Sequence, residues 1–80
     1  MKNKEHADAE AILRTLVIVK PEKFAPWFNL GIIYARQRRF TESAEMFQAA
    51  LRFNPGHKLS RIYLDRVMQA LKFRGNEKIS

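Results

Sequence analysis

The sequence predicts an all-α fold, a solenoid of about four helices arranged as antiparallel helix-turn-helix repeats. Three observations lead to this prediction. The apolar residues fall into four groups with helical spacing, no strand-like alternation of apolar and polar residues persists, and the chain resembles itself after a shift of 34 residues. The connections between the four groups are short, so neighbouring helices must run antiparallel.

The first two helices are separated by a proline. The first is expected over residues 5–19, and Pro21 prevents its continuation. The second begins near Phe24, tolerates Pro26 in its first turn because no backbone donor is needed there, and runs to about Gln37. The apolar residues of the first helix occupy one face, at i, i+3, i+4, i+7 and i+8: Ala9, Ile12, Leu13, Leu16 and Val17.

The third and fourth helices follow a turn at residues 38–40. Thr41 is the expected N-cap of the third helix. The carboxylate of Glu42 interacts favourably with the positive, N-terminal end of the helix dipole. The tripeptide at residues 54–56 ends this helix, and the fourth runs from near Leu59 until it fades at Gly75 and Asn76. The inner face of the third helix comprises Ala44, Phe47, Ala50 and Leu51.

Composition predicts one small globular domain spanning residues 1–80. With 46% hydrophobic and 29% charged residues, the chain is too apolar to be disordered. No apolar stretch approaches the roughly 18 residues of a transmembrane helix, so a cytoplasmic protein is expected. The chain contains no cysteine, which excludes disulfides and thiolate zinc sites.

The 34-residue shift aligns the first helix with the third and the second with the fourth. It places Leu13 on Phe47, Pro21 on Pro55 and Leu30 on Leu64. The complete repeat resembles the tetratricopeptide repeat family, whose pattern is W-x2-L-G-x2-Y, A-x3-F and P within 34 residues. The residues that carry this resemblance are Trp27, Leu30, Gly31, Tyr34, Ser43, Phe47, Ala50 and Pro55.

The resemblance divides the chain into one complete repeat and two partial ones. Residues 24–57 form the complete repeat, in which Ser43 replaces the usual alanine and Arg38-Arg39 replaces the usual Gly-Asp turn. Residues 5–23 correspond to the second helix of a preceding repeat. Residues 58–75 correspond to a first or capping helix, and residues 76–80 form a tail.

Gly31 requires an explanation, because a glycine inside a helix costs roughly 1 kcal/mol relative to alanine. We expect the third helix to approach closely at this point, with Ser43 and Ala44 facing the glycine. Trp27, Leu30 and Tyr34 lie on the same helix face and are expected to pack in the core.

Catalysis is not expected. The two histidines, His6 and His57, have no carboxylates at a metal-ligand or triad spacing, and the three glycines stand alone rather than in a phosphate-binding loop. No metal or cofactor is therefore predicted.

The resemblance implies a protein-interaction module whose concave side binds a peptide or an amphipathic helix. The family's groove positions correspond here to an apolar surface with interspersed arginines, which suits a partner with acidic residues. The alternative is that neighbouring helices partly cover Phe28 and Ile32. The predicted groove residues are Phe28, Ile32, Ala35, Arg36, Ile62, Arg66 and Gln69, and the same surface includes Ala25 and Leu59.

Self-association is a further expectation, because the first helix lacks a partner on one side. The alternatives are that the sequence is a fragment of a longer array, or that a heterologous partner supplies the missing helix. The possible self-association face comprises Ala7, Ala11, Thr15 and Ile18.

A binding function of another class is suggested by the formal net charge of +7. Helical repeats can bind RNA or another polyanion, and six basic residues could converge near one end of the groove and contact phosphates. Nucleic acid is the less favoured partner because the groove positions are apolar. The six residues are Arg36, Arg38, Arg39, Lys58, Arg61 and Arg66.

Overall fold

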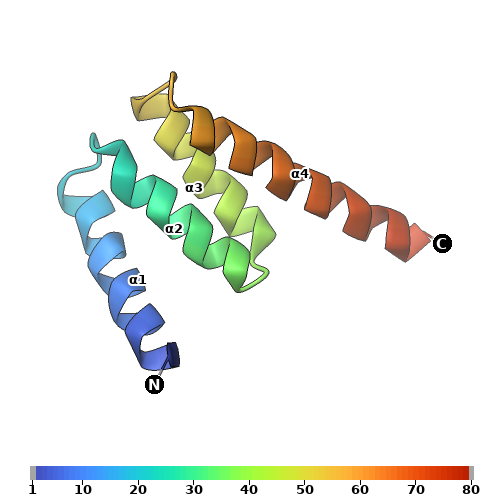
Figure 1. Cartoon of the computed structure of the whole chain (residues 1–80), viewed down its shortest axis with the longest axis horizontal. Helices are drawn as coiled ribbons and strands as arrows, with labels where there is room; N and C mark the ends of the chain where they lie inside the picture. The colour runs from blue at the N-terminus through green and yellow to red at the C-terminus, as the bar shows by residue number, and fades with distance from the viewer. Residues whose placement is uncertain (1, 80) are drawn as a thin grey trace.

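The computed structural model describes the backbone of residues 2–79 and the side-chain surroundings of residues 8–73. It contains four helices: α1 (Lys2–Val19), α2 (Phe24–Arg36), α3 (Phe40–Phe53) and α4 (Lys58–Ile79). The antiparallel pair α2–α3 lies at the centre, with α1 packed on α2 and α4 packed on α3 (Figure 1). The predicted all-α repeat architecture is confirmed.

The α2–α3 pair is closely packed around Gly31. A Cβ atom on this glycine would lie 2.6 Å from the nearest ring carbon of Phe47, a distance that real Cβ contacts do not show. The hydroxyl of Ser43 donates a hydrogen bond of 2.6 Å to the Gly31 carbonyl. The expectations of close approach and of Ser43 facing the glycine are therefore met, but the atoms nearest to Gly31 come from Phe47, and Ala44 packs in a cluster with residues of α4.

Trp27 packs at the end of the pair where α2 begins and α3 ends. Its indole N–H donates a hydrogen bond of 2.8 Å to the Pro21 carbonyl, and its ring stacks on Phe53 with 6.3 Å between the centroids. Leu30, Tyr34 and Phe47 are buried between the helices. Most of the signature residues thus form the core of the complete repeat, because they fill the space between two helix surfaces, whereas Pro55 is exposed in the turn after α3.

The turn between α2 and α3 depends on a left-handed residue. Arg38 has φ 62°, in the region where glycine is favoured and an L residue costs roughly 1 kcal/mol or more. The Arg39 N–H donates to the Tyr34 carbonyl at 2.8 Å, which closes the end of α2. Arg38 therefore stands where the family usually has glycine.

Three predicted helix boundaries differ from the structure, and the first is the start of α1, which lies at Lys2 rather than at residue 5. Helix α3 begins at Phe40 with Arg39 as its N-cap, so the expectation that Thr41 caps it is wrong. Instead, the first turn carries an ion pair between Arg39 and Glu42. Helix α4 continues through Gly75 to Ile79, because an isolated glycine costs only about 1 kcal/mol and no proline follows it.

Candidate functional site

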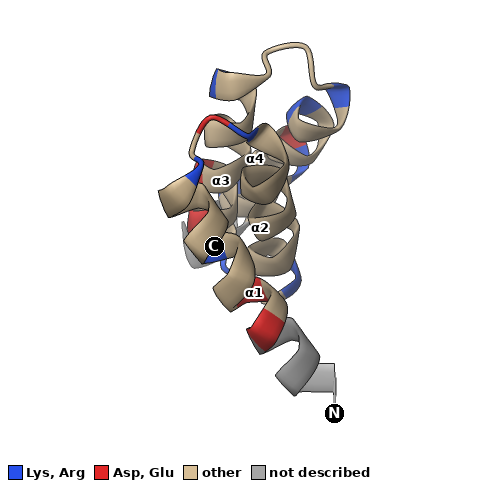
Figure 2. Cartoon of the chain, turned by 90° about the vertical axis from the view of Figure 1, so that its left-hand side faces the viewer, with Lys and Arg blue, Asp and Glu red and all other residues tan. Residues whose placement is uncertain are grey.

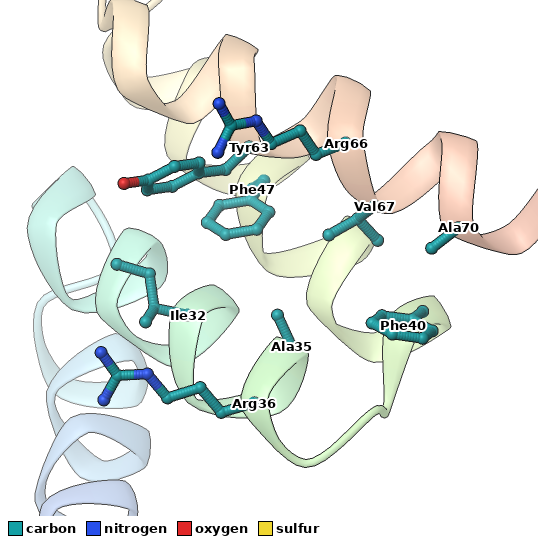
Figure 3. A pocket seen from close by; sticks show the side chains of 9 residues that line it. All are labelled: Ile32, Ala35, Arg36, Phe40, Phe47, Tyr63, Arg66, Val67 and Ala70. Atoms are coloured by element: carbon teal, nitrogen blue, oxygen red, sulfur yellow. The ribbon is translucent and has the colours of Figure 1, made fainter.

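A cavity of about 410 Å³ opens between α2 and α4, with α3 behind it (Figure 3). Helix α2 contributes side chains from its last turns, and α4 contributes side chains one helical turn apart on the face that packs toward α3. All but two of the lining residues are apolar or aromatic. The cavity is lined by Ile32, Ala35, Arg36, Phe40, Phe47, Tyr63, Arg66, Val67 and Ala70.

Aromatic stacking holds one wall of this cavity. The Phe28 ring stacks on Tyr63 with 5.7 Å between the centroids and an interplanar angle of 8°. It also contacts the rings of Phe47 and His57, with 5.7 and 4.9 Å between the ring centroids. Phe28 is half-buried by these neighbours. Of the two interpretations of Phe28, the structure favours the one in which neighbouring helices partly cover it.

The two charged residues of the cavity are arginines on opposite sides of it. Arg36 comes from α2 and Arg66 from α4, and both are exposed (Figure 3). The Arg66 guanidinium lies 5.9 Å from the centre of the Tyr63 ring. Among residues 8–73, neither arginine has a carboxylate within ion-pair distance. The rim of the cavity is therefore positively charged and uncompensated within that part of the chain.

Arg39 provides a contrast, because acidic neighbours occupy its guanidinium. Its Nε donates to a Glu42 carboxylate oxygen at 2.8 Å, and Glu10 lies 3.8 Å away. The guanidinium also lies 4.5 Å from the centre of the Tyr34 ring. The hydrogen bond to Arg39 lowers the pKa of Glu42, and the same bond raises the pKa of Arg39.

The structure places four of the seven predicted groove residues in the cavity, namely Ile32, Ala35, Arg36 and Arg66. Phe28 packs beside it as part of the wall. Ile62 and Gln69 are exposed on α4 but do not line the cavity.

Sequence reasoning missed several lining residues for identifiable reasons. Tyr63 corresponds to Asn29 in the complete repeat. Because Asn29 is polar, the repeat alignment did not indicate an apolar groove residue at this position. Tyr63, Val67 and Ala70, at i, i+4 and i+7, belong to the apolar pattern that predicts the fourth helix, but the groove was predicted from the repeat positions alone. Phe40 was assigned to the turn and lies in the first position of α3.

Of the six basic residues proposed for RNA binding, Arg36 and Arg66 line the cavity and the other four do not. Arg36 ends α2, and Arg38 and Arg39 lie in the turn that follows it. Lys58 and Arg61 lie at the start of α4, next to the opposite end of α3. Lys and Arg are spread over separate elements in the view of Figure 2. No observation favours the nucleic-acid alternative.

The predicted self-association face is exposed where it is described. Ala11 and Thr15 are exposed, and Ile18 is 78% exposed. Ala7 lies outside the residues whose side chains are described. A different face of α1 carries more exposed apolar surface, including Ile12 and Leu16.

His57 has a structural position. Its Nδ1 accepts a hydrogen bond of 3.2 Å from the backbone N–H of Ser60 and lies 2.7 Å from the Ser60 hydroxyl, so it caps the start of α4. The side chain of His6 lies outside the described residues. No cluster of potential metal ligands is found among the described residues, and none of the helices described there combines the length and apolarity that a membrane crossing requires.

The packed antiparallel helices α1 to α4 define a helical-repeat protein. Residues 24–57 match the tetratricopeptide repeat family, so the chain contains one complete tetratricopeptide repeat. Comparisons with curated proteins and with solved structures found no significant match. Repeats of this family are typically non-catalytic modules for protein–protein interaction, and the repeat therefore implies a protein partner.

Proposed function

We propose that the groove between α2 and α4 binds an acidic, amphipathic segment of a protein partner, either as a helix or as an extended peptide. The observation that supports this function is the apolar cavity flanked by Arg36 and Arg66, neither of which pairs with a carboxylate among residues 8–73. An apolar side chain of the partner enters the cavity, and carboxylates on either side of it contact the two arginines.

The size and chemistry of the cavity suit this occupant. A volume of about 410 Å³ lies within the range of small ligand sites, and one Leu or Phe side chain fills only part of it. Burial of such a side chain contributes about 1.5–3 kcal/mol. Arginine also binds carboxylates in a bidentate geometry, which fixes the orientation of the partner.

The experiment uses a synthetic amphipathic peptide of Leu, Phe and Glu, with a control peptide in which Lys replaces Glu. Binding to the full chain is followed by backbone amide chemical shifts. We expect the acidic peptide to shift residues of α2 and α4 around the cavity and the basic peptide to bind much more weakly. If both peptides bind equally, or if the shifts map away from the cavity, the proposal is wrong.

Charge-reversal variants test the role of the two arginines. Arg36→Glu and Arg66→Glu are expected to weaken binding of the acidic peptide about tenfold each, because each removes an attraction and adds a repulsion. Arg52→Glu and Arg61→Glu are the matched controls, since both arginines are exposed and lie outside the cavity. An equal loss in all four variants would indicate general electrostatic attraction rather than a groove.

A further inference from the structure

Helix α1 has an uncovered apolar face that the repeat register identifies. The 34-residue shift aligns Ala9 with Ser43 and Leu16 with Ala50. Ser43 and Ala50 are 0% exposed, because α2 covers this side of α3. In α1 the same side is open, since Leu16 is 38% exposed and Ile12 is 61% exposed. No helix of the described chain covers this face.

The residues of this face follow the spacing of a helix–helix seam. The gaps between them are three, four and three residues, which is the heptad pattern by which two helices pack along each other. We call these four residues the α1 seam: Ala9, Ile12, Leu16 and Val19. Asp8, which is exposed, lies directly beside it.

Helix α4 carries a second exposed seam along the groove. Its residues follow gaps of three, four, three and four, and it borders the cavity through Arg66. All five of its residues are exposed. We call them the α4 seam: Leu59, Ile62, Arg66, Gln69 and Phe73.

We propose that the α1 seam of a second copy of this chain packs along the α4 seam and occupies the groove. This inference rests on the proposed function, because α1 presents an exposed apolar face beside the carboxylate of Asp8, the combination that the groove is proposed to bind. Within one chain, α1 packs on α2 and α4 packs on α3, on opposite sides of the central pair, so the occupant comes from another copy (Figure 1).

Spacing and charge both favour this occupant. The gaps of three, four and three in the α1 seam match those from Leu59 to Gln69 in the α4 seam. Residues 58–73 carry four cations and one carboxylate, whereas Asp8 beside the α1 seam has no ion pair with any of residues 8–73. The carboxylate of Asp8 therefore meets a basic helix.

The other face of α4 does not suit α1. The residues of α4 that correspond to Trp27 and Gly31 are Arg61 and Asp65, and both are exposed. A helix packed there would bury both charges at a close helix contact, which is costly. The α4 seam, with Leu59, Ile62 and Phe73, is therefore the surface that α4 offers to a second copy.

The first test measures molar mass by sedimentation equilibrium over a wide concentration range. The unmodified chain is expected to associate, and Leu16→Glu and Ile62→Glu are each expected to weaken association about a hundredfold, because each buries a carboxylate in the seam. Ile18→Glu and Met68→Glu are the matched controls. These residues are 78% and 49% exposed, lie on the same two helices outside the seams, and should leave association unchanged.

A mixing experiment distinguishes this contact from others. The Ile62→Glu chain keeps an intact α1 seam and the Leu16→Glu chain keeps an intact α4 seam. Each should be monomeric alone, and an equimolar mixture should form a one-to-one complex. If Ile62→Glu still associates while Leu16→Glu does not, two α1 helices pair with each other and the proposal is wrong. Failure of the mixture to form a complex also overturns it.

The same samples separate this inference from the proposed function. If the unmodified chain is monomeric at every concentration but the synthetic acidic peptide binds the cavity, the second-copy proposal is wrong and the groove function stands. If the chain associates through the two seams and the peptide does not bind even the monomeric Leu16→Glu chain, whose groove is free, the groove serves this chain alone and a heterologous acidic partner is excluded.

Discussion

The complete repeat, α2–α3, and the half-repeats that flank it, α1 and α4, occupy the same register but differ in burial. Leu30 and Phe47 are buried in the complete repeat, whereas Ile12 and Met68 in the flanking helices are exposed. The two ends also differ from each other, because α1 presents an apolar face and α4 presents Arg61 and Asp65. The C-terminal side thus has the polar outer face of a capping repeat, and the N-terminal side has not.

The difference shows that a repeat position acquires its role only from the helix that packs on it. Gly31 and Asp65 stand at the same position of successive repeats. The first lies against the Phe47 ring, and the second is exposed because no helix of the described residues covers it. Substitutions at matched positions should therefore have unequal effects.

The largest contrast is expected at this position. Gly31→Leu should lower the free energy of unfolding by about 3 kcal/mol, because even a Cβ atom would lie 2.6 Å from a buried ring. Asp65→Leu should change it by less than about 0.5 kcal/mol, since that side chain is exposed. Urea unfolding followed by circular dichroism measures both variants.

If Gly31→Leu does not fold, Gly31→Ala provides a milder version with an expected loss of about 2 kcal/mol. Gly56→Ala is the control, because the nearest atom to a Cβ there is 4.0 Å away and the glycine does not have positive φ. Equal stability of the two alanine variants would mean that α2 and α3 are not closely packed at Gly31.

A second contrast concerns a groove position of the repeat, occupied by Phe28 in α2 and by Ile62 in α4. Phe28→Asp should lower the free energy of unfolding by about 2–3 kcal/mol, because it removes a ring packed on Phe47 and Tyr63 and places a charge among aromatic rings. Ile62→Asp should have little effect on the monomer, since that side chain is exposed. Thermal and urea unfolding at low protein concentration provide the measurement.

This contrast also sharpens the definition of the groove. If Phe28→Asp unfolds at the same urea concentration as the unmodified chain, Phe28 is an open groove residue, as one interpretation of the sequence has it. If it is destabilised as expected, the binding surface begins at Ile32 and the cavity, and Phe28 supports it from behind.

The sequence predicted the helices and the core of the complete repeat because helical spacing and the signature residues report directly on packing between α2 and α3. It predicted less of the groove. Arg36 and Arg66 were found through the register of the repeat, whereas Tyr63 was missed because its counterpart, Asn29, is polar. Apolar spacing indicates which side of a helix is inward but not whether a neighbour covers it, so the exposure of Ile12 was not foreseen.

A smaller contrast concerns the turn after α2 and the equivalent position in α4. Glycine substitutions at these two positions should change the free energy of unfolding in opposite directions. Arg38→Gly should raise the free energy of unfolding by about 1 kcal/mol, because glycine adopts the φ of 62° without the strain of a side chain. Lys72, one repeat later, lies inside continuous α4, and Lys72→Gly should lower it by up to about 1 kcal/mol. A destabilising effect of Arg38→Gly in urea unfolding would show that the Arg38 side chain contributes more than its backbone conformation costs.

The smallest effect is expected from pH, at another matched pair of positions, Glu42 and Asp8. The hydrogen bond from Arg39 lowers the pKa of Glu42 below its ordinary value of 4.5, so the folded state favours the ionised carboxylate. The resulting stabilisation is complete above the ordinary pKa and is lost as the pH falls through the lowered one.

The Glu42→Gln variant should therefore have a lower urea midpoint than the unmodified chain at neutral pH, and the difference should disappear in acid and shrink in high salt because the pair is exposed. Asp8→Asn, at the equivalent position of α1, should leave the urea midpoint of the monomer unchanged at neutral pH, since Asp8 has no ion pair with residues 8–73. A Glu42→Gln midpoint that tracks the unmodified chain from neutral pH to acid would mean that the Arg39 ion pair does not stabilise the first turn of α3, and that the complete repeat differs from the half-repeats in packing alone.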